Sequence, residues 1–220
     1  NEMLQPTACE IQSDRAVPNA SRRTRVLAIS GRTGIAGLDV ARKVFERFDP
    51  DIAWQPHHTD GDAVDAGSAV LTVSGKLQAL LKGERVALNF LMRLSGIATW
   101  VRAYVEAAGP GGPRVVDTRK TTPLHRHLEK YAVRCGGAHN HRFALYDGVM
   151  VKDNHIAACG GVAAAVARIR GRISHLMKIE IEVATLEHEF GAVRCAAARG
   201  LYLEPYVGAG DVGEVDVHAV

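Results

Sequence analysis

The chain has 220 residues, of which 47% are hydrophobic and 23% charged, as is typical of a globular protein with a sizeable core. Its net charge of +3 is too small to indicate nucleic-acid binding. No apolar run approaches the roughly 20 residues that a membrane-spanning helix needs. The four cysteines are widely spaced and form no CxxC pair, which is typical of reduced thiols and predicts a cytoplasmic protein.

The first half of the chain predicts a small unit of mixed helix and strand. The stretch "TRVLAIS" (24–30) favours a strand, and a Gly-rich turn separates it from an amphipathic helix over 38–48. Residues 54–75 contain β-branched pieces broken by Asp-Gly and Ala-Gly turns, which predict short strands and hairpins.

A long helical pattern over 76–108 follows, and Gly83 and Gly96 are expected to divide or bend it. The run "GPGGP" (109–113) then breaks the pattern. We therefore expect two domains, residues 1–110 and 111–220.

Beyond the break, strands and helices alternate. This spacing predicts βαβ units and a parallel sheet, either open or closed into a barrel. The last stretch, "VGAGDVGEVDVHAV" (207–220), is too short to complete a barrel. The expected strands are 114–118, 148–153, 178–183 and 201–206, and the expected helices are 123–137, 160–173 and 185–200.

Charged residues collect where these strands are expected to end. Between Asp117 and His155 there are seven Lys or Arg, five His and only four acids. Because the sites of α/β sheets and barrels form at the carboxyl ends of strands, we expect a cationic mouth that suits a small, multiply charged anion. Arg can bind carboxylate or phosphate through two hydrogen bonds, and Lys acts as a point charge. The cations expected on this rim are Arg119, Lys120, Arg142 and Lys152.

Plainer interpretations apply to several of the other charges. The alternation of a strand places Glu180 and Glu182 on one face, and an ordinary amphipathic strand explains that pattern almost as well as a site does. The helix positions Arg126, His127, Lys130 and Arg134 are expected to be solvated surface.

A second chemistry stays open at this point. The "HNH" motif (139–141), together with Asp153 or His155, could bind zinc in a metal-dependent hydrolase. The cations around it would repel a dication.

Several long, ordered motifs resemble those of the quinolinate phosphoribosyltransferase family. The resemblance covers roughly residues 16–200. It is carried by "GERVALNFLMRLSGIAT" (83–99), "VVDTRKTTP" (115–123), "LEKYAVRCGG" (128–137), "NHRFALYD" (140–147), "VKDNHI" (151–156) and "IEIEVATLE" (179–187).

The resemblance implies an α/β protein, with an N-terminal α/β sandwich domain followed by an open α/β barrel that is incomplete in this chain. It also implies transfer of the phosphoribosyl group of phosphoribosyl pyrophosphate to quinolinate with loss of CO₂, in de novo NAD biosynthesis. Mg²⁺ would assist. The implied assembly is a homodimer or a higher oligomer, in which each subunit contributes to its neighbour's site, with no nucleic-acid or membrane partner.

Site residues follow from the same resemblance. The implied catalytic residues are Lys120, Lys152 and Glu182. The candidates to hold Mg²⁺ are Glu182 and Glu204. The expected substrate-binding residues are Arg85, Arg119, His141, Arg142, Lys152, Glu182 and Glu204.

The last part of the matching region departs from the family pattern. The chain has Leu203, Glu204 and Pro205 where the family has Leu-Asp-Asn, and Pro205 has no amide to donate. The Gly-rich phosphate-binding segments of the family are at best represented by residues 207–220. An alternative expectation is therefore a truncated or degenerate member that keeps the fold without catalysis.

Overall fold

The computed structural model describes residues 9–12, 22–29, 31–182, 203–207 and 215–219. Two compact units make up the chain, unit 1 from residues 1–107 and 120–140 and unit 2 from residues 108–119 and 141–220. The boundary expected at residue 110 stays a prediction, because a compact unit need not fold independently.

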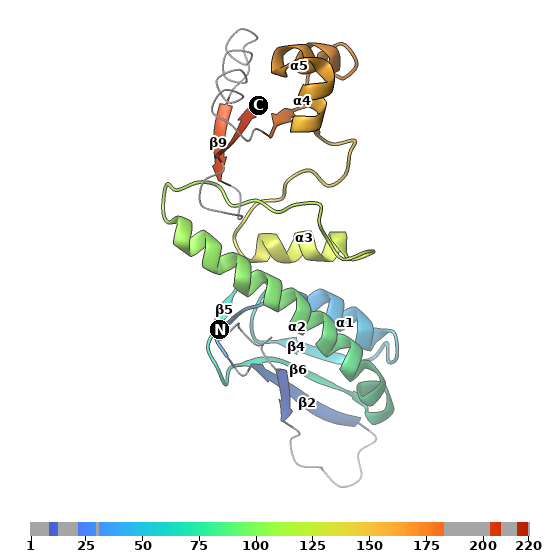
Figure 1. Ribbon diagram of the computed structural model, residues 1–220. Helices are drawn as coiled ribbons and strands as arrows, with labels where there is room; N and C mark the ends of the chain where they lie inside the picture. Colours follow the sequence, from blue (N-terminus) through green and yellow to red (C-terminus); the bar gives the residue numbers. More distant parts are fainter. Residues whose placement is uncertain (1–8, 13–21, 30, 183–202, 208–214, 220) are drawn as a thin grey trace. The chain divides into compact units, whose positions relative to one another are not determined.

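Unit 1 is built on an antiparallel four-stranded sheet in the order β1-β2-β6-β4 (Figure 1). Helices α1 and α2 cover one face of this sheet, which makes a two-layer α/β sandwich as expected. The short strands β3 and β5 pair separately. The elements are β1 (Cys9–Gln12), β2 (Arg22–Ile29), β3 (Thr33–Gly34), α1 (Leu38–Glu46), β4 (Ala53–Pro56), β5 (Ala63–Val64), β6 (Ala69–Lys76), α2 (Leu77–Ala108) and α3 (Arg126–Cys135).

The core of unit 1 lies between the sheet and the two helices. Leu27 of β2 and Leu71 of β6 are buried against Phe45 of α1 and Leu80 of α2. Burying side chains of this size stabilises the fold by about 1.5–3 kcal/mol each relative to leaving them in water. The alternating apolar residues of the strands and the helical stripe of α1 therefore meet in one core.

Helix α2 is continuous over 32 residues, so Gly83 and Gly96 do not divide it, and the alternative of a bend at these positions stays a prediction. Gly83 has a packing role instead, because a Cβ atom at this position would lie 2.8 Å from Cδ1 of Phe45. The glycine thus lets α1 and α2 approach each other closely, and the helix tolerates its cost of about 1 kcal/mol.

Helix α3 packs against the C-terminal half of α2. Ala132 of α3 is buried with Leu94 and Ala98 of α2. At the end of α3, a Cβ atom on Gly136 would lie 2.7 Å from the carbonyl oxygen of Ala98, so the chain needs a glycine there. This packing fixes the position of the segment that enters α3.

Unit 2 contains a second four-stranded sheet, in the order β7-β8-β10-β9. Strands β7 and β8 are parallel and are connected through α4 and α5, as the βαβ pattern predicts. Strand β10 pairs antiparallel with both β8 and β9, and the sheet is open among the described strands. The elements are β7 (Val149–Val151), α4 (Asp153–Cys159), α5 (Val162–Arg170), β8 (Ile179–Ile181), β9 (Leu203–Val207) and β10 (Val215–Ala219).

Two expected elements of the second half are not found as predicted among the described residues. The strand expected over 114–118 is wrong, since Val116 alone makes a β-bridge there. Two adjacent valines favour a strand only when a neighbouring strand offers a ladder of hydrogen bonds. The helix expected over 185–200 lies outside the described residues.

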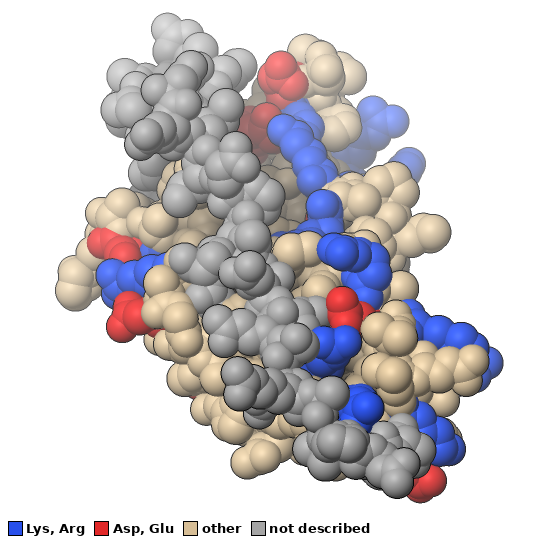
Figure 2. Space-filling view, turned by 90° about the horizontal axis from the view of Figure 1, so that it is seen from below, with Lys and Arg blue, Asp and Glu red and all other residues tan. Residues whose placement is uncertain are grey.

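Within the described ranges, no helix is both long enough and apolar enough to cross a bilayer. Lys and Arg side chains are interspersed with Asp and Glu on the face shown in Figure 2. Cys135 and Cys159 are free thiols, as their spacing predicts.

Candidate active site

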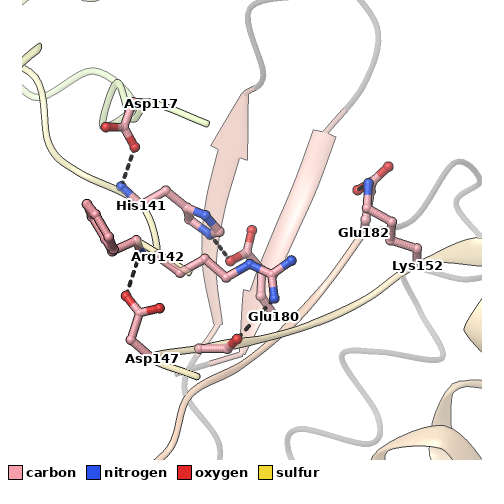
Figure 3. A network of polar contacts seen from close by, with 9 residues as sticks. Asp117, His141, Arg142, Asp147, Lys152, Glu180 and Glu182 are labelled. Carbon is pink, nitrogen blue, oxygen red and sulfur yellow. Dashed lines mark hydrogen bonds and ion pairs between the residues drawn. The ribbon is translucent and has the colours of Figure 1, made fainter. Parts of the chain in front are cut away.

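His141 is held from two sides in unit 2. Its backbone N–H donates a 2.8 Å hydrogen bond to Oδ1 of Asp117, and its Nε2 pairs with the carboxylate of Glu180 on β8 (Figure 3). Both side chains of the pair are largely buried, with exposed fractions of 17% for His141 and 18% for Glu180. The imidazole therefore has a fixed orientation, and this pairing gives Glu180 a role beyond that of an ordinary strand residue.

Arg142 follows directly and is fixed by the backbone of its own loop. Its Nη1 donates a 3.0 Å hydrogen bond to the carbonyl oxygen of Gly148, just before β7. Its Nε is buried and has no hydrogen-bond partner in the part of the chain that the structure describes. The carboxylate of Asp147 shapes the loop by accepting from the amides of Phe143 and Ala144, at 2.5 and 2.7 Å. A guanidinium with an unused buried N–H is well suited to an anionic acceptor.

Lys152 lies at the end of β7, where the chain turns into α4. Its backbone N–H donates a 3.0 Å hydrogen bond to Nδ1 of His155, which fixes the start of the helix. Its Nζ pairs with the carboxylate of Glu182, just after β8, as Figure 3 shows. The exposed fractions of these two side chains are 46% and 45%, so solvent and solutes can reach the pair.

Glu180 of β8 and Glu182, the residue directly after β8, thus present two carboxylates from one face to two different basic side chains. Glu180 meets His141, and Glu182 meets Lys152. The parallel pairing of β7 with β8 puts Val151 opposite Ile181, which brings the ends of these strands together as the βαβ pattern predicts.

Arg119 and Lys120 lie in the segment between Val116 and α3, not at the end of a strand. Arg119 is half-buried and belongs to unit 2, while Lys120 is exposed and belongs to unit 1. Thr121 accepts a 3.2 Å hydrogen bond on its hydroxyl from Nε of Arg126, so the residues after Lys120 are tied to α3. The position of Arg126 on the helix predicts a solvated side chain, but this hydrogen bond shows that the side chain is not simply solvated.

The remaining expected residues lie on other elements. Arg85 is exposed on α2 in unit 1, and Glu204 lies in β9 of unit 2. Lys130 of α3, expected at the surface, has only 4% of its area exposed, so that expectation is wrong. The periodicity of α3 alone could not show this, because the burial comes from its packing in the folded unit.

A zinc site of the kind that His139, His141 and Asp153 could form finds no support. Among the described residues, no three His, Cys, Asp or Glu side chains are grouped so that they could hold a metal ion. His141 instead pairs with a single carboxylate, and Oδ1 of Asp153 accepts from the amide of Asn154 at 2.7 Å. Unit 2 instead places the basic side chains of His141, Arg142 and Lys152 among the carboxylates of Glu180 and Glu182.

Comparison with protein-family models gives two matches to one family. The model described as "Quinolinate phosphoribosyl transferase, N-terminal domain" matches residues 11–95, and the model of the C-terminal domain matches residues 97–202.

Individual relatives agree with this match. A probable nicotinate-nucleotide pyrophosphorylase [carboxylating] from Synechocystis is 52% identical over 153 residues, which are 70% of this chain and 52% of that protein. The protein of the same description from Bacillus subtilis is 45% identical, over 74% of this chain and 56% of that protein. The chain thus spans about half the length of the curated relatives it matches.

A solved structure supports the fold. The crystal structure of NadC from Streptococcus pyogenes superimposes with a TM-score of 0.77 at 44% identity, and covers 80% of this chain and 62% of that one.

Proposed function

Since the chain belongs to the quinolinate phosphoribosyltransferase family, we propose that it binds quinolinate and transfers the phosphoribosyl group of phosphoribosyl pyrophosphate to it, with loss of CO₂. The products would be nicotinate mononucleotide, pyrophosphate and CO₂, in the biosynthesis of NAD. The observation that carries the proposal is the pairing of His141 with Glu180 and of Lys152 with Glu182 at the end of β8, in the unit that also positions Arg142.

Recognition of quinolinate requires fixed positive charge, because the substrate carries two adjacent carboxylates. Arg142 offers a guanidinium that is already oriented by its hydrogen bond to Gly148. Lys152 offers an exposed ammonium, and Arg119 offers a second guanidinium. Charged hydrogen bonds of this kind are worth about 1.5–3 kcal/mol each, so a few of them select a dianion over a monoanion.

The coupling step joins the ring nitrogen of quinolinate to the anomeric carbon of the ribose. The nitrogen lone pair forms the new C–N bond, and the pyrophosphate leaves with the electrons of the C–O bond. Cations that hold both carboxylates also align the nitrogen with the sugar carbon, which lowers the entropic cost of the reaction. Positive charge develops on the ribose as pyrophosphate departs, and we assign its stabilisation to the carboxylate of Glu182.

Decarboxylation follows from the charge of the coupled ring. The nitrogen is now cationic, so the electron pair released when CO₂ leaves the adjacent carbon is stabilised next to it. A proton then replaces CO₂ at that carbon. Lys120 and Lys152 are the cations we assign to this step, since each carries an exposed ammonium.

Mg²⁺ fits this donor set in one specific way. Glu182 is a half-exposed carboxylate, and Mg²⁺ in phosphate-binding sites is often held by one or two carboxylates plus the phosphate oxygens of the substrate. Glu182 would hold the ion, with Glu204 of β9 as the second candidate. When bound, the ion would neutralise charge on the pyrophosphate.

We also propose that the chain acts as a homodimer in the cytoplasm, with Arg85 contributing to the neighbouring subunit's site. Arg85 is exposed on α2, so its guanidinium is accessible to another subunit. The free thiols of Cys135 and Cys159 agree with a reducing compartment.

The test is to incubate the purified chain with quinolinate, phosphoribosyl pyrophosphate and Mg²⁺ and to follow CO₂ release. Release that requires both substrates supports the proposal. Saturable quinolinate binding without release would instead favour a family member that keeps the fold but not the catalysis.

A further inference from the structure

The backbone that follows Lys120 is held in place at Thr122, whose polar groups form hydrogen bonds with residues of α2 and α3 in unit 1. The amide of Thr122 donates a 3.1 Å hydrogen bond to Oε2 of Glu129 on α3. The hydroxyl of Thr122 accepts from Nη2 of Arg93 on α2. The carbonyl oxygen of Thr122 accepts a further 3.0 Å bond from the amide of His125. All three polar groups of Thr122 are therefore used, two residues after Lys120.

Glu129 joins these contacts because its two oxygens have different partners. Oε1 accepts from Nε of Arg93 at 3.2 Å and also from Nη2 of the same guanidinium. Oε2 accepts from the backbone of Thr122. One carboxylate thus connects α2 to the main chain of the segment that carries Lys120.

This acid is buried, with 12% of its side chain exposed, whereas Arg93 has 47% exposed. Burial alone would raise the pKa of Glu129, but the hydrogen bonds from Arg93 and Thr122 outweigh that effect and hold the pKa below its usual value. The carboxylate is therefore ionised in the folded protein at neutral pH.

A buried acid needs a reason beyond stability. Removing a charge from water is costly unless the charge is paired, and an apolar side chain of similar size often serves a core equally well. What an apolar side chain cannot do is accept the amide of Thr122 and so fix the path of the backbone. The contacts of Glu129 end on the main chain two residues after Lys120, so a loss of position there would move the segment that carries Lys120.

We propose that Glu129 is a positioning residue for quinolinate binding, which acts by holding the backbone after Lys120 in place, with Arg93 as its ion-pair partner. Glu129 does not touch substrate; it acts through Lys120. This inference rests on the proposed function, because it assumes that Lys120 faces quinolinate.

Glu129→Gln is the informative change, since it keeps the shape of the side chain and removes its charge. Calorimetric titration should show the Kd for quinolinate rising by about tenfold or more, the usual range when a group that orients a ligand is lost. Hydrogen exchange of peptides covering residues 119–124 should become faster in the same variant, because the Thr122 amide loses a strong acceptor.

The decisive measurement is a double-mutant cycle with Lys120→Ala. If Glu129 acts through Lys120, then Glu129→Gln changes the Kd by less than about twofold when Lys120 is already absent. Equal effects in both backgrounds would overturn the inference. If Glu129→Gln does not fold, Thr122→Val is the second variant to test. It removes the hydroxyl that accepts from Arg93 with little change of shape, and it should also weaken quinolinate binding.

The matched control is Glu46→Gln, which breaks the exposed Arg42–Glu46 pair of α1 and should leave the Kd unchanged. Wild-type protein that binds no quinolinate would contradict the proposed function itself. If the wild-type protein binds quinolinate but the effects of Glu129→Gln and Lys120→Ala on the Kd are additive, only this inference is contradicted.

Discussion

The ammonium of Lys152 pairs with the carboxylate of Glu182 across the ends of β7 and β8. Both residues are assigned to the chemistry, one to the substrate carboxylate and the other to the ribose. Under the proposed function, each of the two residues would exchange this partner for a group of the substrates. Because both side chains are about half exposed, the pair is worth only about 0–1 kcal/mol and yields readily to a stronger partner.

Glu182→Gln should separate the two roles. Quinolinate should bind as tightly as before or more tightly, by at most about fivefold, because Lys152 loses a competing carboxylate. CO₂ release should fall strongly, since the developing charge on the ribose loses its counter-ion. Calorimetry measures the first effect and release of labelled CO₂ the second. Weaker quinolinate binding in this variant would argue against the assignment.

Arg119→Ala should weaken quinolinate binding by about 2–5 kcal/mol, the cost of leaving a substrate carboxylate without its charged partner. The measurement is calorimetric titration at constant ionic strength, because salt screens such contacts. Arg168→Ala, which removes an exposed guanidinium at the end of α5, is the matched control and should bind normally. An unchanged affinity for Arg119→Ala would remove this residue from the site.

Acid should weaken the fold in a way that depends on Glu129. Its pKa is lowered by folding, so its stabilising effect is fully present above the unfolded value of 4.5 and is lost as the pH falls through the folded value. Thermal unfolding of wild type and Glu129→Gln should therefore differ at pH 7 and converge as the pH falls below 4.5. A constant difference over this range would show that the charge of Glu129 contributes nothing.

Tyr131 should stabilise unit 1 through its hydroxyl. It donates a 2.6 Å hydrogen bond to Oδ2 of Asp60, and burial together with this carboxylate raises the pKa of the phenol well above its usual value. The carboxylate of Asp60 also accepts hydrogen bonds from the amides of Gly37 and Leu38 at the start of α1. Tyr131→Phe should lower the free energy of unfolding by about 1.5–3 kcal/mol, because the acceptor is charged. Denaturation in urea measures the loss.

The control for this change is Tyr104→Phe, since Tyr104 is exposed on α2 and contacts Trp100 through its ring. Its free energy of unfolding should stay within about 0.5 kcal/mol of wild type, as is usual for surface substitutions. An equal loss of unfolding free energy in both variants would mean that the hydrogen bond of Tyr131 to Asp60 does not cause the destabilisation.

Local patterns predicted most elements because their causes are local. The stripe of α1 and the alternation of β6 both record burial on one face, and the βαβ spacing predicted the parallel pair of β7 and β8. The strand expected over 114–118 failed because strand formation depends on a partner far away in sequence. Helix α4 was missed because His155, and not a Ser, Thr, Asp or Asn before the helix, accepts the amide at its start.

The candidate site shows the same division. Charges on "RVVDTRKTTP" and "VKDNH" predicted candidate anion-binding residues directly, because cations close together in sequence need a counter-ion, and these residues stay a prediction. Two carboxylates that hold neighbouring segments were not visible in the same way. Glu180 and Glu129 have the spacing of ordinary surface residues, and only the folded chain brings them to His141 and Thr122.

If several cations of this chain form a binding site for a doubly negative pyridine, as proposed, a paired titration tests this most directly. Quinolinate should bind at a single saturable site. Nicotinate, which lacks the second carboxylate, should bind roughly tenfold to a hundredfold more weakly, as expected for the loss of one charged hydrogen bond. Equal affinity for the two acids, or no saturable binding of quinolinate, would contradict the account.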